Sequence, residues 1–330
     1  MKILRDVISS MLACLAAACA AAQTAPLPQL TGAIEMPAVK GRIDHFGIDA
    51  KGRRLFVAAL GNDTIEVIDL GTGRRERGLR GFGEPQGVLY VPETNRVFVA
   101  NGSANRVDVL DGTSLAAIKR IGGLEDADNL RYDVTARKVY VGYGGGALRA
   151  IDPDTGESTG DIRLPGHPES FQLEQRGTRI FVNVPGAHQV VVAERAKRAV
   201  VATWDVPGAA ANFPMALDEA SHRLFVGARR PAELLVYDTE TGKVVARQSI
   251  GGDTDDLYFD AARRRLYAVC GEGRIDVLRQ DSPDRYVLEG TVTTAPRART
   301  GLFVPEEGKL YVAAPASGAA AARVLAYRVR

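Results

Sequence analysis

The chain is poor in the residues that build covalent crosslinks and heme sites. Of its three cysteines, Cys14 and Cys19 fall in the first 22 residues, so Cys270 stands alone in the rest of the 330-residue chain. A lone cysteine cannot form an intramolecular disulfide, and we expect Cys270 to be buried as a small apolar side chain. No Cys-x-x-Cys-His motif is present, so attachment of a c-type heme is not expected.

An excess of charge of either sign is also lacking. The 42 basic side chains nearly cancel the 40 acidic ones, and no basic stripe with interleaved aromatic residues is visible. Binding to nucleic acid relies on such a footprint, so none is evident here.

Long apolar runs are missing, except for one at the N-terminus. Lys2 and Arg5 precede an Ala-rich run over residues 11–22, which is too short to span a membrane as a helix. The pattern is typical of a secretory signal peptide over residues 1–22. Cleavage after Ala22 leaves no membrane span, and we expect a periplasmic or secreted protein.

A rival interpretation of the N-terminus is lipid attachment at Cys19. The three residues before it, Ala16-Ala17-Ala18, form only a degenerate lipobox. We therefore expect soluble release, with residues 23–29 as a short linker before the folded part of the chain.

What the sequence does have is a repeat. A basic residue, a branched aliphatic residue and an aromatic residue recur seven times at intervals of 41 to 44 residues. The aromatic anchors are Phe56, Phe98, Tyr140, Phe181, Phe225, Tyr267 and Tyr311. Each unit has turn signals that divide it into four short strands, a period typical of a propeller blade rather than of a helical solenoid.

The second unit shows the strands most clearly. They are expected over residues 87–93, 96–101, 106–112 and 116–123. The seventh unit ends at Arg330 after its third strand, so a strand near residues 30–38 is expected to complete it and to cover the open sheet edge. The sequence thus predicts an all-β fold, a seven-bladed β-propeller over residues 30–330 that we expect to be monomeric.

The repeat resembles that of the YVTN-repeat β-propellers. The Leu/Val-Phe/Tyr-Val-Ala strand and the Asp-x-x-Thr-Gly turn, as at Asp238, carry the resemblance, and the chain is similar to YncE-like periplasmic members over residues 30–330. The resemblance implies a fold rather than one activity. Quinoprotein dehydrogenases have tryptophan docking motifs in most blades, and the single Trp204 means that no PQQ is expected, just as no heme is.

A functional site is expected where the repeat is broken, because a residue that every blade needs recurs in the blades. We aligned the units on their aromatic anchors and compared the entrances to the first strands, which surround the channel mouth. Apart from the blade 5 pair Phe213-Pro214, the entrance residues are mostly polar and differ from blade to blade. The predicted ligand-binding residues are Asp44, His45, Gln86, Asp128, Asn129, Glu169, Asn212, Asp255, Asp256 and Arg299.

These residues predict a channel mouth with negative potential. Eight arginines occupy turns on the opposite face, which explains the balanced total: Arg53, Arg54, Arg96, Arg137, Arg176, Arg223, Arg263 and Arg264. An acidic mouth attracts cations or cationic ligands. The alternative is that polar residues simply line a water-filled channel and bind nothing.

Three functions fit this pattern. The first is binding of a small ligand, a divalent cation or a protein partner without turnover, and another is an accessory subunit of a periplasmic redox enzyme. The remaining one is a metal-assisted lactone hydrolase or lyase, in which oxygen ligands hold Ca²⁺ or Mg²⁺. The candidate metal ligands are Asn129, Glu169, Asp255 and Asp256.

Histidine is scarce at the predicted site. Two of the four histidines, His45 and His167, lie at first-strand entrances and are the candidate general bases of the enzyme hypothesis. His45 follows Asp44, but successive strand residues point to opposite faces, so the two side chains need not touch.

Overall fold

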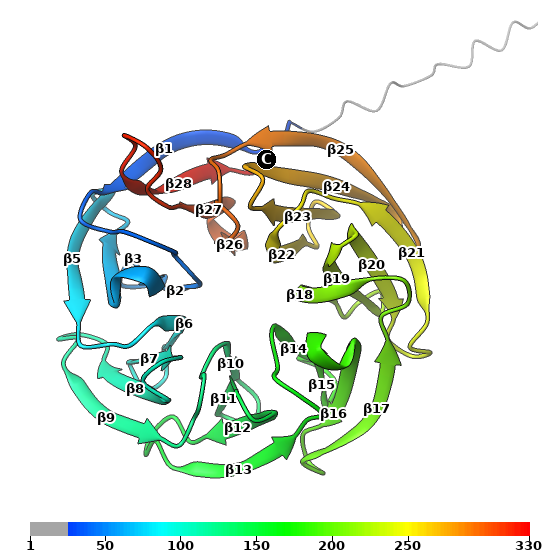
Figure 1. Cartoon of the computed structure of the whole chain (residues 1–330), viewed down its shortest axis with the longest axis horizontal. Helices are drawn as coiled ribbons and strands as arrows, with labels where there is room; N and C mark the ends of the chain where they lie inside the picture. Colours follow the sequence, from blue (N-terminus) through cyan, green and yellow to red (C-terminus); the bar gives the residue numbers. More distant parts are fainter. Residues whose placement is uncertain (1–25) are drawn as a thin grey trace, which may run out of the picture.

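The computed structural model describes residues 26–330 and shows seven four-stranded antiparallel sheets arranged in a ring (Figure 1). The prediction of a seven-bladed β-propeller is therefore confirmed. The predicted signal peptide and the linker up to residue 25 lie outside the described residues. Within them, no helix has the length and apolar character needed to span a bilayer.

In blades 1 to 6 the strands lie in chain order from the channel outward, whereas in blade 7 the N-terminal strand β1 is the outermost (Figure 1). Blade 1 contains β2 (Phe46–Asp49), β3 (Arg54–Ala59), β4 (Thr64–Asp69) and β5 (Arg74–Arg80). Blade 2 contains β6 (Pro85–Val91), β7 (Arg96–Asn101), β8 (Arg106–Asp111) and β9 (Ala117–Gly122). Blade 3 contains β10 (Leu130–Asp133), β11 (Lys138–Tyr143), β12 (Ala147–Ile151) and β13 (Ser158–Arg163). Blade 4 contains β14 (Phe171–Leu173), β15 (Arg179–Val184), β16 (Gln189–Glu194) and β17 (Ala199–Asp205).

The remaining blades follow the same plan. Blade 5 contains β18 (Ala210–Asp218), β19 (Arg223–Arg230), β20 (Ala232–Asp238) and β21 (Val244–Ser249). Blade 6 contains β22 (Thr254–Asp260), β23 (Arg265–Cys270), β24 (Arg274–Ser282) and β25 (Arg285–Thr293). Blade 7 contains β26 (Gly301–Val304), β27 (Lys309–Ala314), β28 (Ala322–Arg328) and β1 (Gln29–Met36). Three short 3₁₀ helices, η1 (Leu60–Asn62), η2 (Pro185–Ala187) and η3 (Pro305–Glu307), lie in connections.

The seven aromatic anchors all lie on the second strand of their blade and are buried. Phe98 of blade 2, for example, shares an apolar cluster with Leu130 and Val139 of blade 3. A β-sheet must bury its apolar face against another layer, and here each blade provides that layer for its neighbour. The anchors recur because every blade repeats the same inter-blade contact.

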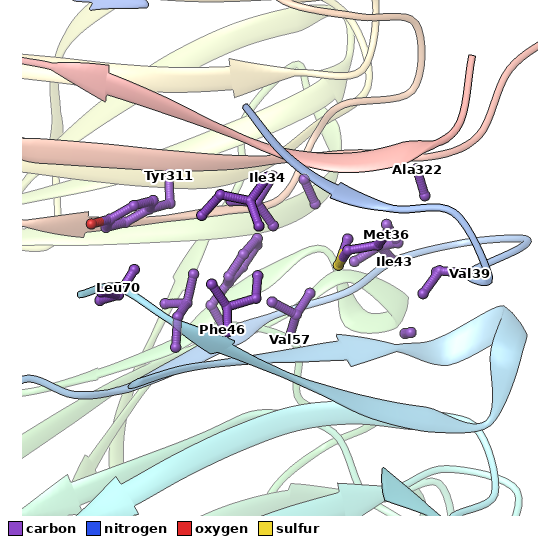
Figure 2. Close-up of a cluster of buried hydrophobic side chains, with 14 of the residues drawn as sticks. Ile34, Met36, Val39, Ile43, Phe46, Val57, Leu70, Tyr311 and Ala322 are labelled. Carbon is purple, nitrogen blue, oxygen red and sulfur yellow. The ribbon is translucent and has the colours of Figure 1, made fainter. Parts of the chain in front are cut away.

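The N-terminal strand closes the ring, as the missing fourth strand of the seventh repeat predicted. β1 pairs with β28 from Gln29 opposite Arg328 to Met36 opposite Ala322. Its buried side chains Ile34 and Met36 join the cluster that fills the junction between blades 7 and 1 (Figure 2). Both the edge of blade 7 and the junction with blade 1 are thereby covered.

A β-bulge lies at the entrance to the first strand of several blades. In blade 1 the N–H of Asp44 donates to the carbonyl of Ala58, whose own N–H donates to the carbonyl of His45, so two residues oppose one. The same pattern recurs in blades 3 and 4, where residues 128–129 and 169–170 form the bulge. Because a bulge breaks the strict alternation of side chains, two successive residues can face the channel region.

Candidate functional site

Two cavities lie in the channel region. One, of about 510 Å³, is at the mouth, and the other, of about 430 Å³, lies deeper between the first strands, with His45 lining both. Of the predicted ligand-binding residues, the mouth cavity contains His45, Gln86, Asp128, Glu169, Asp255 and Arg299. The inner cavity contains His45, Asn129 and Asp256. Asp44 and Asn212 line neither cavity.

His45 contacts groups from three blades. Its Nε2 lies 3.6 Å from Oδ1 of Asp44 and 3.4 Å from Nδ2 of Asn129, and its Nδ1 lies 3.6 Å from Oδ2 of Asp256. The contact with Asp44 corrects the argument from alternation, because the bulge turns both side chains toward each other. The sequence carries no clear signal for such a bulge.

The surroundings of His45 favour its protonated form. Burial alone lowers the pKa of the imidazole, but the carboxylates of Asp256 and Asp44 outweigh burial and raise the pKa to about 10. His45 is therefore a cation at neutral pH. In that state it cannot accept a proton, so the role of general base does not suit it.

The other candidate base, His167, lies at the edge of the mouth. Its Nδ1 is 3.9 Å from Oδ2 of Asp126, whose other oxygen accepts a hydrogen bond of 2.9 Å from the Gln86 amide. Both histidine and carboxylate belong to the connections that lead into first strands. Gln86 and His167 thus form one rim of the mouth cavity.

Asp128 and Glu169 are the unusual carboxyl groups of the mouth. Burial raises the pKa of Asp128 to about 7; the carboxylates of Asp44 and Asp255 add to the rise, and the cations His45 and Arg42 oppose it. Burial likewise raises the pKa of Glu169 to about 8, with Asp128 and Asp255 contributing. Within residues 26–330 neither forms an ion pair, and the one side-chain hydrogen bond between them and the protein is from Asn129 Nδ2 to Asp128, at 3.4 Å.

Asp255, in contrast, forms ion pairs with two arginines. It pairs with Arg229 and, at 2.9 Å, with Arg299, which also pairs with Asp253 at 2.9 Å. Arg229 stacks on the Phe213 ring at 4.1 Å from the ring centre. Arg229 was not predicted from the sequence, because the second strand of blade 5 extends to Arg230 and carries the Arg229 side chain into the mouth. The signal that could have indicated it is the Arg229-Arg230 pair in the fifth repeat.

These arginines change the predicted electrostatics of the mouth. Arg42 pairs with Asp44 at 2.6 Å, so that Asp44, Asp253 and Asp255 are each matched by a guanidinium. Among the carboxylates that line the mouth cavity, Glu84, Asp128 and Glu169 form no ion pair within residues 26–330, and the raised pKa values of Asp128 and Glu169 limit their charge at neutral pH. The mouth is polar, yet its negative charge is smaller than a count of carboxylates indicates.

The four predicted metal ligands do not converge. Asp255 is held by arginines, whereas Asp256 contacts His45 and accepts a 2.8 Å hydrogen bond from the N–H of Gly301. The amide of Asn129 lies between His45 and an arginine, and Glu169 stands apart in the mouth. Within residues 26–330 no three His, Cys, Asp or Glu side chains are grouped to hold a metal ion.

Asn212 belongs to a contact between blades. Its fully buried amide donates to Oδ1 of Asn183 and to the carbonyl of Gln189, at 3.1 Å each. Cys270 is also buried, with its Sγ 3.3 Å from the hydroxyl of Thr254, and burial raises the pKa of its thiol to about 11. Both side chains sit in packed surroundings outside the two channel cavities.

Comparisons with known proteins support the fold. A chain of the structure of hydrazine synthase from Kuenenia stuttgartiensis is similar to this chain, with a TM-score of 0.72 and 16% identity, over 83% of this chain and 94% of that one. A chain of a mitotic checkpoint complex is similar with a TM-score of 0.78 and 14% identity, over 99% of each. No protein-family model and no curated protein matches the sequence. At these identities the likeness concerns the propeller fold.

Proposed function

We propose that this propeller is a binding protein whose ligand occupies the channel mouth. The observation that carries the proposal is the pair of carboxyl groups of Asp128, which is buried, and Glu169, which is half-buried. Neither forms an ion pair within residues 26–330, and the more distant cations His45, Arg42 and Arg229 offset their burial only in part. Burying an ionisable group in this way reduces stability. Groups that weaken the fold and line a cavity are typical of functional sites.

The site suits a small polar molecule that accepts hydrogen bonds. A carboxyl group with a pKa of about 7 or 8 holds its proton for much of the time at neutral pH, and so donates a hydrogen bond instead of attracting a cation. The mouth cavity of about 510 Å³ has the size of ordinary small-molecule sites. We therefore favour a neutral or weakly charged oxygen-rich ligand over a divalent cation.

Metal-assisted lactone hydrolysis or lyase chemistry is the second candidate. Ca²⁺ or Mg²⁺ in the mouth would have to displace Arg229 and Arg299 from Asp255, because the other oxygen ligands are spread over both cavities. Asp128 or Glu169, rather than His45, would then be the acid or base near neutral pH.

The chain's setting is likewise part of the proposal. The N-terminal pattern of Lys2, Arg5 and the Ala-rich run supports export to the periplasm. The repeated strand and turn motifs support membership of the YVTN-repeat propellers as a YncE-like protein. Docking as an accessory subunit of a redox enzyme rests on a weaker basis: one similar chain comes from a structure named hydrazine synthase, at 16% identity.

The proposal can be tested by a melting-temperature screen of three proteins. A library of small polar molecules, with lactones and with Ca²⁺, Mg²⁺ and Zn²⁺, is applied to the wild type, to Asp128→Asn/Glu169→Gln and to Glu35→Gln/Glu306→Gln. The last variant removes two exposed carboxylates away from the channel. A ligand at 100 times its Kd stabilises the native state by about 2.7 kcal/mol.

We expect one chemical class to raise the Tm of the wild type and the control variant, and to lose most of this effect in the mouth variant. Absence of any hit in the wild type contradicts a binding function, and equal shifts in all three proteins contradict a site at the mouth. A shift with metal ions alone would favour the lactonase or lyase alternative.

A further inference from the structure

The inner cavity contains an arginine that the channel-mouth pattern did not include. Arg131 lies on β10 and lines the cavity of about 430 Å³ together with His45 and Asp256. Its guanidinium stacks on the Phe171 ring, 5.5 Å from the ring centre. Such stacking fixes the direction of the planar group and leaves its edge for hydrogen bonding.

The partners of Arg131 are all neutral. Its Nη1 donates to the Leu130 carbonyl at 2.8 Å and to Oδ1 of Asn129 at 3.2 Å, and its Nη2 lies 3.5 Å from the hydroxyl of Ser170. Among residues 26–330 no carboxylate lies within 4 Å of this guanidinium. Burial lowers the pKa of Arg131, and the carboxylates of Asp256 and Asp128, which lie beyond 4 Å, oppose this shift without cancelling it.

The remaining groups of the inner cavity form no direct ion pair with Arg131. The cation His45 and the carboxylate Asp256 neutralise each other at 3.6 Å. Tyr258 donates its hydroxyl to the Gly301 carbonyl at 2.6 Å, and Gln172 donates to the Met215 carbonyl at 2.8 Å. The lining is otherwise apolar in large part, so its charged side chains, the cations Arg131 and His45 and the carboxylate Asp256, sum to one positive charge.

The arginines of the mouth, unlike Arg131, form ion pairs with carboxylates. Arg42 has Asp44 as its partner, whereas Arg229 and Arg299 share Asp253 and Asp255. Among the arginines that line the two channel cavities within residues 26–330, Arg131 is thus the one without an ion pair, and its remaining N–H groups can bind an anion. Arginine holds a carboxylate by two parallel hydrogen bonds, which its planar group is shaped to make.

We propose that Arg131 binds a carboxylate, and that the ligand of this protein is a small organic monoanion. The carboxylate lies in the inner cavity against Arg131, and the oxygen-rich remainder extends past His45 into the mouth toward Asp128 and Glu169. A monoanion matches the one net positive charge of the cavity lining, and the carboxylate of Asp256 repels a second negative charge. This inference rests on the proposed function of the mouth, whose ligand class it defines.

Formate tests the inference, because it is small enough that shape cannot prevent its entry. Formamide is the neutral control of nearly equal size. In ¹⁵N-labelled protein, the Nε–H signal of Arg131 is assigned from its loss in Arg131→Lys. We expect formate to shift this signal saturably, with a Kd in roughly the millimolar range, while formamide leaves it unchanged.

Variants provide the second readout. Formate is expected to raise the Tm of the wild type and of the control Arg163→Gln, which removes an exposed charge on β13. It should not raise the Tm of Arg131→Gln, whose affinity for formate should be about tenfold or more below that of the wild type. Arg131→Lys keeps the positive charge without the planar guanidinium group and should bind formate more weakly than the wild type. A wild-type signal that formate does not saturate up to about 50 mM overturns the inference.

The outcomes also separate this inference from the proposed function. A neutral mouth ligand that binds equally to the wild type and Arg131→Gln overturns the carboxylate site and leaves the binding function in place. Formate bound at Arg131 without any larger ligand sensitive to Asp128→Asn/Glu169→Gln supports the anion site and contradicts a ligand in the mouth.

Discussion

Two carboxyl groups, those of Asp128 and Glu169, give the mouth its character. In the folded protein their pKa values are about 7 and about 8, well above the ordinary values of 3.8 and 4.5. Between these limits the native state binds more protons than the unfolded chain, so stability falls as pH rises. His45, raised from 6.5 to about 10, has the same effect at higher pH.

We therefore predict that the Tm of the wild type falls between about pH 5 and about pH 9. Asp128→Asn/Glu169→Gln should differ little from the wild type near pH 5 and melt roughly 2 °C or more above it near pH 9, since the amides carry no charge to desolvate. Scanning calorimetry at both pH values measures the effect. A variant that is less stable than the wild type at pH 9 would show that the ionised carboxylates have native partners.

Part of the mouth lining could be predicted from the sequence, because aligning the repeats on their aromatic anchors showed which positions break the pattern, and six of the ten predicted residues line the mouth cavity. The interactions among these residues could not be predicted in the same way. The contact of His45 with Asp44 depends on a bulge, and the pairing of Asp255 depends on the length of β19, which brings in Arg229. Both are tertiary features that a linear pattern does not encode.

Strands show a closer agreement between sequence and structure. The closing strand was expected near residues 30–38 and is β1 (Gln29–Met36), and the second blade's strands differ from the expectation by about two residues at their ends. Alternation of side chains predicts such elements well, because it follows directly from strand geometry. In β1 it places Ile34 and Met36 inward. Strict alternation would place Leu30 on the same face, but a register shift between Leu30 and Gly32 interrupts it, and Leu30 lies 57% exposed.

Met36→Ala should destabilise the ring, because this fully buried side chain fills the junction between blades 7 and 1 (Figure 2). Replacing a buried methionine by alanine costs about 2–5 kcal/mol, whereas Leu30→Ala on the same strand should change stability by about 0.5 kcal/mol or less. Urea denaturation of both variants measures the difference. Equal losses would contradict the assignment of β1 as the packed closure of blade 7.

At the scale of the whole molecule, the ring places different chemistry on its two faces. The first-strand entrances bring polar residues from every blade except blade 5 around the mouth, and the first turn of most blades brings an arginine to the opposite face. The seven-fold repeat makes this arrangement predictable, whereas the choice of ligand depends on residues that occur in one blade each.

One further cavity competes with the mouth as a binding site. It has a volume of about 570 Å³ and lies between blades 3 and 4, where Lys138, Tyr140 and Arg198 contribute to its lining. Its ion pairs, such as that of Lys138 with Asp152 at 2.9 Å, are of the ordinary structural kind. Its lining has no counterpart of the unpaired carboxyl groups of the mouth.

The most direct test is a crystal structure of the protein with the compound that raises its Tm most. We predict ligand density in the channel mouth, with ligand oxygen atoms within about 3.2 Å of the carboxyl groups of Asp128 and Glu169. Density between blades 3 and 4, with only water in the mouth, would contradict the proposed site.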